Sequence, residues 1–165
     1  MIVVLMGVSG AGKTTIGEKL AERIGVSFAD ADDYHPVANK QKMAAGIPLN
    51  DDDRQPWLEE LNRLMQGWFA AGKGGVLACS ALKDKYRTTL AANMPARTVH
   101  FVLLDLSREI LEQRLRERSH EYMNPKLLDS QLATLEKPKD GDALRVVNDK
   151  APEEIVNEIL AALQG

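Results

Sequence analysis

Residues 2–14, which read I-V-V-L-M-G-V-S-G-A-G-K-T, decide the fold. The apolar run 2–6 contains β-branched residues and predicts a buried strand. It leads directly into residues 7–14, which match G-x-x-x-x-G-K-[ST], the pattern of a phosphate-binding loop. Residues 13–24 carry apolar side chains at fourfold spacing and predict a helix, whose N-terminus would direct a positive dipole end at the same anion. Strand, loop and helix in this order predict a nucleoside triphosphate site.

Each part of the loop has an expected role. The glycines let the backbone turn sharply and bring its N–H groups close to an anion. Lys13 is expected to reach the β- and γ-phosphates, and the Thr14 hydroxyl to bind Mg²⁺. The expected nucleotide contacts in this stretch are Gly7, Val8, Ser9, Gly10, Ala11, Gly12, Lys13, Thr14 and Thr15. A glycine-rich turn that matches by chance is the competing interpretation, and the flanking strand and helix argue against it.

Length and composition indicate one globular domain, residues 1–165, with 44% apolar residues. The net charge of −3 argues against a nucleic-acid or anionic-membrane partner, which would favour a basic excess. Cys79 is the only cysteine, so we expect no disulfide framework and no cysteine-rich metal site. No stretch approaches 18 apolar residues, so no membrane span is expected.

The rest of the chain alternates between strand and helix patterns. Further strands are expected at 27–31, 76–79, 99–104 and 143–147. Helices are expected at 36–45, 57–71, 83–93, 107–118 and 127–135, and from 152 onward. Residues 50–53, which read N-D-D-D, supply candidate N-caps before the strongly helical pattern that begins at Trp57. An aromatic and aliphatic stripe runs along the helix from Trp57, and core packing is favoured over a ligand site there. This alternation predicts a five-stranded parallel sheet with helices on both faces and catalytic loops at the carboxyl ends of the strands.

An acidic cluster, Asp30, Asp32 and Asp33, follows the second expected strand. One carboxylate there can hold Mg²⁺ through water, and another can accept the proton of an attacking hydroxyl. A solvated acidic turn is the alternative, which the nearby phosphate loop makes less favoured. The chain has no D-x-x-G after the loop and no [NT]-K-x-D, so a GTPase is not expected. The pattern favours a kinase.

Three longer blocks make the interpretation specific. Residues 30–58 read D-A-D-D-Y-H-P-V-A-N-K-Q-K-M-A-A-G-I-P-L-N-D-D-D-R-Q-P-W-L. Residues 79–83 read C-S-A-L-K, with Tyr86-Arg87 after them, and 127–131 read L-L-D-S-Q, with T-L-E at 134–136. With the loop, these blocks resemble the gluconate kinase family, P-loop enzymes that phosphorylate the 6-hydroxyl of D-gluconate with ATP.

The resemblance covers about residues 2–138 and carries further implications. It implies a cytoplasmic, ATP- and Mg²⁺-dependent enzyme that forms a homodimer. It also implies a fold like that of nucleoside monophosphate and shikimate kinases. Within that fold we expect a substrate-binding helical region at about 33–56 and a mobile lid at about 119–126.

The resemblance suggests roles for individual residues. Asp30 would join Thr14 around Mg²⁺, and Asp32 would take the proton of the substrate hydroxyl. The expected substrate contacts are Asp32, Asp33, His35, Lys42, Arg54, Lys83 and Arg87. Arginine matches the planar geometry of a carboxylate. Because Lys83 and Arg87 are four residues apart, they are expected to share one helical face.

Arginines before the lid complete the expected site. By resemblance to related kinases, Arg118 is expected to meet the transferring phosphoryl group, which makes Lys13, Asp32 and Arg118 the catalytic set. The same resemblance implies that Arg114 stacks on adenine, whereas Arg116 is expected to be solvated. Closure of 119–126 would exclude water, which otherwise competes with gluconate as the acceptor.

Two alternatives remain open. The first is a related kinase for another small hydroxy acid such as shikimate, although residues 80–83, S-A-L-K, lack the glycine cluster of shikimate kinases. The second is a nucleotide-binding protein without turnover. The presence of Lys13, Thr14, Asp30 and Asp32 together argues against it.

Overall fold

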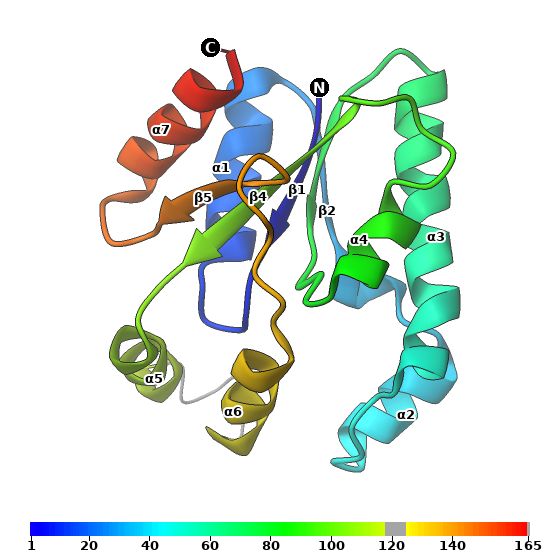
Figure 1. The fold of residues 1–165 in the computed structure, drawn as a ribbon, viewed down its shortest axis with the longest axis vertical. Coiled ribbons are helices and arrows are strands. Elements are labelled where there is room, and N and C mark those ends of the chain that lie inside the picture. Colours follow the sequence, from blue (N-terminus) through cyan, green and yellow to red (C-terminus); the bar gives the residue numbers. More distant parts are fainter. Residues whose placement is uncertain (118–124, 165) are drawn as a thin grey trace.

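A computed structural model describes residues 1–117 and 125–164 and shows a parallel five-stranded sheet with the order β2-β3-β1-β4-β5 (Figure 1). The strands are β1 (Ile2–Met6), β2 (Ser27–Asp30), β3 (Gly75–Ala78), β4 (Val99–Asp105) and β5 (Leu144–Val147). All four pairings are parallel. The predicted sheet is confirmed, with strand ends within one residue of those expected.

The central strand is β1, and the phosphate-binding loop follows it directly. Val4 lies between Leu77 of β3 and Phe101 of β4 in the register of the sheet. Every residue of β1 is buried, because neighbouring strands cover both edges and helices cover both faces. The loop therefore begins from the most firmly held strand of the sheet.

The helices form two layers around the sheet. They are α1 (Lys13–Ile24), α2 (Val37–Ala44), α3 (Asp51–Ala70), α4 (Asp84–Leu90), α5 (Arg108–Glu117), α6 (Pro125–Thr134) and α7 (Pro152–Gln164), with a short 3₁₀ helix η1 (Ala31–Tyr34). The α1 and α7 helices pack together on one face, and α3 and α4 on the other (Figure 1). At the carboxyl edge of the sheet, α2 and the start of α3 lie on one side and α5 and α6 on the other. Within the described ranges, no helix combines the length and apolarity that crossing a bilayer requires.

Helix α3 begins at Asp51, directly after the first of the candidate caps at 50–53 and six residues before the strongly helical pattern that begins at Trp57. Asn50 caps it: its side chain accepts a hydrogen bond from the Asp53 N–H (2.8 Å), and the Asp53 carboxylate accepts one from the Asn50 N–H (3.0 Å). This reciprocal cap stabilises the first turn. Pro56 lies inside the helix and removes only one backbone hydrogen bond.

The apolar stripe on α3 packs mainly into the core, as predicted. Trp57, Leu58, Leu61 and Met65 are buried, whereas Phe69 near the end of the helix is 47% exposed. Trp57 also donates its indole N–H to the carbonyl of Ala31 (2.7 Å). The stripe therefore fixes α3 against the sheet and also holds η1, which carries part of the acidic cluster.

Gly75 allows α3 to approach the sheet closely. A Cβ atom at this position would lie 2.1 Å from the Trp68 ring, far inside van der Waals contact. Gly67, on the same helix as Trp68, has nothing within 4 Å of its ideal Cβ position.

We expect Gly75→Ala to lower the free energy of unfolding by about 1–3 kcal/mol, because the indole of Trp68 must shift within a packed core. The matched control, Gly67→Ala, should raise it by about 0.5–1 kcal/mol through helix propensity. Urea denaturation of the three proteins measures both effects. Equal stability of Gly75→Ala and the wild type would contradict the packing described here.

Candidate functional site

The phosphate-binding loop owes its shape to glycines with positive φ. Gly10 (φ 86°) and Gly12 (φ 93°) adopt the left-handed conformation that other residues rarely enter. Gly7 has φ 144°, and a Cβ there would lie 2.8 Å from the Leu104 carbonyl oxygen. The Ala11 N–H closes a turn on the Val8 carbonyl (3.2 Å), and Gly12 caps α1. The loop thus wraps the positive end of α1, as predicted for an anion site.

Lys13 reaches back across the loop. Its ammonium group donates to the carbonyls of Gly7 (2.8 Å) and Val8 (3.1 Å). The charge is therefore held over the concave side of the loop, where phosphate oxygens are expected. Thr15, the last predicted contact, is exposed on the first turn of α1.

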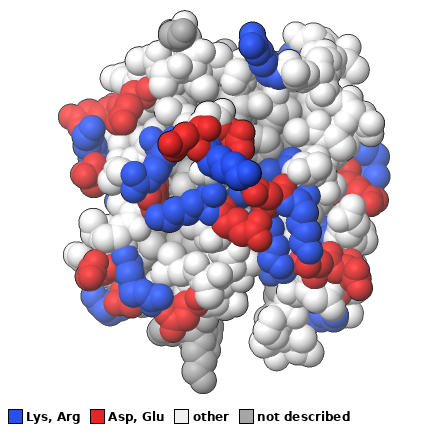
Figure 2. Space-filling view, in the orientation of Figure 1, with Lys and Arg blue, Asp and Glu red and all other residues white. Residues whose placement is uncertain are grey.

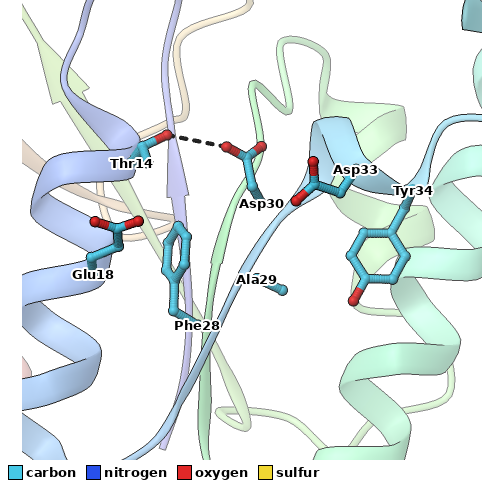
Figure 3. A pocket seen from close by; sticks show the side chains of 7 residues that line it. All are labelled: Thr14, Glu18, Phe28, Ala29, Asp30, Asp33 and Tyr34. Atoms are coloured by element: carbon cyan, nitrogen blue, oxygen red, sulfur yellow. Dashed lines mark hydrogen bonds between the residues drawn. The ribbon is translucent and has the colours of Figure 1, made fainter.

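The carboxylate of Asp30 connects this loop to the acidic cluster. One of its oxygens accepts a hydrogen bond from the Thr14 hydroxyl (3.1 Å), and the other accepts one from the Asp32 N–H (3.0 Å). Figure 3 shows Asp30 between Thr14 on α1 and Asp33 on η1. These contacts bring the predicted magnesium ligands and the predicted base into one group.

Asp32 lies within electrostatic range of Lys13. Asp32 is exposed by surface area, yet desolvation by the surrounding protein and then the Asp30 carboxylate raise the pKa of Asp32, while Lys13 lowers it. A carboxyl group with a raised pKa, next to a phosphate-binding loop, is suited to accept a proton from a hydroxyl.

A hollow of about 530 Å³ opens beside Thr14 and Asp30 (Figure 3). Glu18, Asp33 and Tyr34 also line it. Its three carboxylates would repel the carboxylate of a sugar acid, so that group must bind elsewhere. The expected cations lie farther along, on α2, α3 and the loop before α4.

Arg54 and Lys83 converge on one aromatic side chain. The Arg54 guanidinium lies 5.5 Å from the centre of the Tyr86 ring, and the Lys83 ammonium lies 5.7 Å from it. Arg54 also donates to the Tyr86 hydroxyl (3.0 Å), and Lys83 to Asp51 (3.2 Å). Hydrogen bonds from Lys85, Tyr86 and Lys83 hold the pKa of Asp51 well below its usual range. Arg54 and Lys83, which are predicted to bind the carboxylate of the substrate, thus lie close together. Each already donates a hydrogen bond within the protein.

Lys42 on α2 contacts the start of α3, the helix that carries Arg54. Its ammonium group donates to both carboxylate oxygens of Asp53 (2.8 and 2.9 Å), which joins α2 to the cap of α3. Figure 2 shows basic and acidic side chains interleaved on the face in view. The positive charge near the site is therefore local and largely paired.

Arg87 does not join this cluster, contrary to the prediction. Its guanidinium is buried and donates to the carbonyls of Ala81 and Glu136 (2.7 Å each) and to Asp84. The shared helical face was also wrong, because Lys83 is the extended N-cap of α4 and lies outside the helix. Arg87 is a structural link between two loops.

His35 stacks on Trp57, with ring centres 4.2 Å apart and planes 14° apart. The amide nitrogen of Asn39 donates to the Asp53 carbonyl (2.9 Å), which can only accept, so this bond fixes the orientation of the amide. The same nitrogen lies 3.2 Å from His35 Nδ1, which must accept. Neutral His35 therefore carries its proton on Nε2 and can donate it to a ligand oxygen.

The arginines on α5 are only partly described. Arg114 donates to the Asn148 carbonyl (2.9 Å) and lies close to Gly12, which fits contact with a nucleotide. Arg118 and residues 119–124 of the predicted lid lie outside the described residues.

Sequence reasoning missed Asn148, the residue after β5. Its buried side chain donates to the Ala11 carbonyl (2.8 Å) and supports the phosphate-binding loop from behind. A buried polar residue directly after a core strand was the available signal. Cys79, at the end of β3, is also buried, and burial raises the pKa of its thiol to about 12.

Metal binding at Thr14 and Asp30 is chemically reasonable. Both offer hard oxygen ligands beside the phosphate-binding loop, and Mg²⁺ is held typically by one or two protein groups together with phosphates and water. Across the described residues, no three His, Cys, Asp or Glu side chains form a metal-binding group of their own.

The fold and this arrangement define a P-loop kinase that acts on a small molecule. The profile of the shikimate kinase family matches residues 9–164. A probable gluconokinase from Xenopus tropicalis is 47% identical over 96% of this chain and 91% of its own. A gluconokinase from Gluconobacter oxydans is 43% identical over 98% of this chain and 90% of its own.

Solved structures agree. A gluconokinase from Sinorhizobium meliloti superposes with a TM-score of 0.87 and 40% identity, covering 99% of this chain and 91% of that one. APS kinase from Mycobacterium tuberculosis, solved with AMPPNP and APS, shows the same fold at 18% identity, with a TM-score of 0.68 over 99% of this chain and 98% of that one. The chain belongs to the gluconokinase family of P-loop kinases.

We predict that His35 stays neutral from about pH 7.5 to pH 5. Burial, then Arg54 and Lys40, lower the pKa of His35 from 6.5 to about 4. Histidine ¹⁵N spectra should show the Nε2–H form across that range. A midpoint near 6.5 would contradict the prediction. Because the unfolded chain binds this proton at the ordinary pKa, His35 should make the fold less stable as pH falls from about 6.5 toward 4.

Proposed function

We propose that this protein transfers the γ-phosphoryl group of ATP to the 6-hydroxyl of D-gluconate, giving 6-phospho-D-gluconate and ADP. The observation that carries the proposal is the Asp30 carboxylate, which ties Thr14 of the loop to the backbone of Asp32. That contact joins the candidate base to the phosphate-binding loop, over which the terminal phosphate is proposed to bind. The identity with gluconokinases supports the choice of acceptor.

The reaction needs positioning more than strong basicity. An alkanol is a weak acid, so its proton moves late, as the new P–O bond forms and the bond to the ADP oxygen breaks. Asp32 orients the 6-hydroxyl and accepts its proton. Lys13 and the N-terminus of α1 stabilise charge on the phosphate oxygens. Mg²⁺, when bound at Thr14 and Asp30, neutralises the phosphates.

Substrate binding is proposed on the α2–α3 side of the loop. Arg54 and Lys83 bind the carboxylate of gluconate, and Asp33, His35 and Lys42 bind its hydroxyls. Neutral His35 supplies a donor from Nε2. Arg114 contacts the nucleotide, and Arg118 is proposed to meet the transferring phosphoryl group by resemblance to related kinases.

The cellular setting and the assembly state are also proposed. An ATP-dependent kinase of a small sugar acid works where ATP is available, which favours the cytoplasm. A homodimer is proposed by resemblance to the family, and light scattering at micromolar concentration tests it. A single scattering mass near 18 kDa would reject the dimer.

A substrate panel tests the central proposal. ADP release is measured with gluconate, shikimate, nucleoside monophosphates and other sugar acids at equal concentrations. We expect gluconate to give the highest kcat/KM, because Arg54 and Lys83 together supply two positive charges for its carboxylate. A preference for any other acceptor would overturn the choice of substrate.

Asp32→Asn should reduce kcat by about 10²–10⁴-fold, since the amide keeps the size of the carboxyl group but accepts no proton. ATP affinity should stay within a few-fold of wild type, because Asp32 does not belong to the phosphate-binding loop. The control is Asp52→Asn, on the exposed first turn of α3. Turnover by Asp32→Asn equal to that of the control would reject Asp32 as the base.

Arg54→Met should raise KM for gluconate about tenfold or more, because a hydrogen bond to a charged group contributes about 1.5–3 kcal/mol. KM for ATP should change little. Arg63→Met, an exposed change on the same helix, serves as the control. Unchanged KM for gluconate in Arg54→Met would place the substrate carboxylate elsewhere.

A further inference from the structure

Helix α6 touches the phosphate-binding loop through one side chain. The Ser9 N–H donates to the side-chain oxygen Oε1 of Gln131 (2.7 Å), and both residues are partly buried. Because the backbone N–H can only donate, the amide of Gln131 must present its oxygen to it. No role for Gln131 follows from the phosphate-binding pattern, which contains only residues 7–14.

The end of this segment, at Glu136, is hydrogen-bonded to the loop between β3 and α4. Glu136 donates its N–H to the Leu82 carbonyl (2.7 Å) and accepts the Asp84 N–H on its carboxylate (2.9 Å). The buried Arg87 donates to the carbonyls of Ala81 and Glu136 (2.7 Å each). Residues 131–136 therefore join the phosphate-binding loop to the loop between β3 and α4, and we call them the bridging segment.

The loop that the bridging segment holds is strained and faces the proposed substrate. Ala81 has φ 45°, a left-handed conformation that costs a non-glycine residue about 1–2 kcal/mol. Lys83, two residues later, is a proposed ligand of the gluconate carboxylate. The phosphate-binding loop also contacts this strained loop directly, through the Gly7 N–H and the Ser80 carbonyl (3.2 Å). The bridging segment and the Gly7–Ser80 hydrogen bond therefore both connect the site for the phosphoryl donor to the site for the phosphoryl acceptor.

We propose that Gln131 is a positioning residue for phosphoryl transfer, which holds the phosphate-binding loop at a set distance from the acceptor-binding loop. The inference rests on the proposed function. Phosphoryl transfer depends on in-line placement of the two substrates, and a shift of about 1 Å can cost about 10²-fold in rate.

The chemistry of the side chain fits this role. Glutamine offers a neutral acceptor, so it anchors Ser9 without adding negative charge beside the phosphates. Gly10 and Gly12, both with positive φ, shape the stretch of the loop that follows Ser9. The N–H groups of this stretch, up to that of Lys13, face the expected anion. Gln131 therefore occupies the Ser9 N–H, which was expected to contact the nucleotide, and the N–H groups from Gly10 to Lys13 are proposed to bind the phosphate.

Two variants and a control test this inference. Gln131→Met keeps the length of the side chain and removes the acceptor. Gln131→Glu keeps an acceptor oxygen but adds a negative charge. The control is Gln113→Met on α5, an exposed position where the amide donates to exposed Glu117 (3.3 Å). For each protein we would measure thermal stability, the Kd for ATP, kcat, both KM values and the ratio of ADP released to product formed.

For Gln131→Met we expect kcat to fall by about 10–100-fold while the Kd for ATP stays within about threefold, and ADP release without product to increase. Gln131→Glu should recover most of kcat at saturating ATP but bind ATP about tenfold more weakly. Gln113→Met should match the wild type in every measurement.

Three results would overturn the inference: wild-type kcat in Gln131→Met, tighter ATP binding with higher kcat in that variant, or equal losses of kcat in both Gln131 variants. The second result would mean that ATP has to displace Gln131. Failure of the proposed function would appear in the wild-type protein as a preference for another acceptor. The Gln131 variants would then be compared with that acceptor, so the two failures are distinguishable.

Discussion

The site depends on a single carboxylate, that of Asp30. One of its oxygens accepts a hydrogen bond from the Thr14 hydroxyl, and the other accepts one from the Asp32 N–H. Its two hydrogen bonds join the acidic turn of η1 to the first turn of α1. The strand β2 that carries Asp30 lies at the edge of the sheet, separated from β1 by β3. A side chain at the end of an edge strand thus reaches the helix that follows the central strand. The geometry works because parallel strands end at one edge of the sheet.

Local patterns were sufficient to predict the framework. The apolar strands, the glycine-rich loop and the helical periodicities depend on neighbours in the sequence, so the five-stranded sheet and the phosphate-binding loop were predicted correctly. The start of α3 was indicated by the candidate caps at 50–53, and the reciprocal cap of Asn50 and Asp53 outweighs the helix-breaking tendency of Pro56. A breaker near a helix start is a weak signal when a strong cap precedes it.

The parts of the site that were missed depend on contacts between distant segments. Spacing alone suggested that Lys83 and Arg87 would act together, but the chain enters α4 between them and Arg87 turns inward to Glu136. Asn148 and Gln131 support the phosphate-binding loop from residues more than 120 positions away. Sequence spacing within one element carries no information about such pairs. The resemblance to a known family supplied the substrate and the expected residue roles, but neither of these two contacts.

The buried state of Cys79 has a practical consequence. Thiolate, not thiol, reacts with alkylating reagents and oxidants, and this sulfur is both enclosed at the end of β3 and reluctant to ionise. Reagents in solution should therefore modify the native protein only when the sheet opens. The rate of labelling at Cys79 would therefore measure how often β3 separates from its neighbours, without any introduced probe.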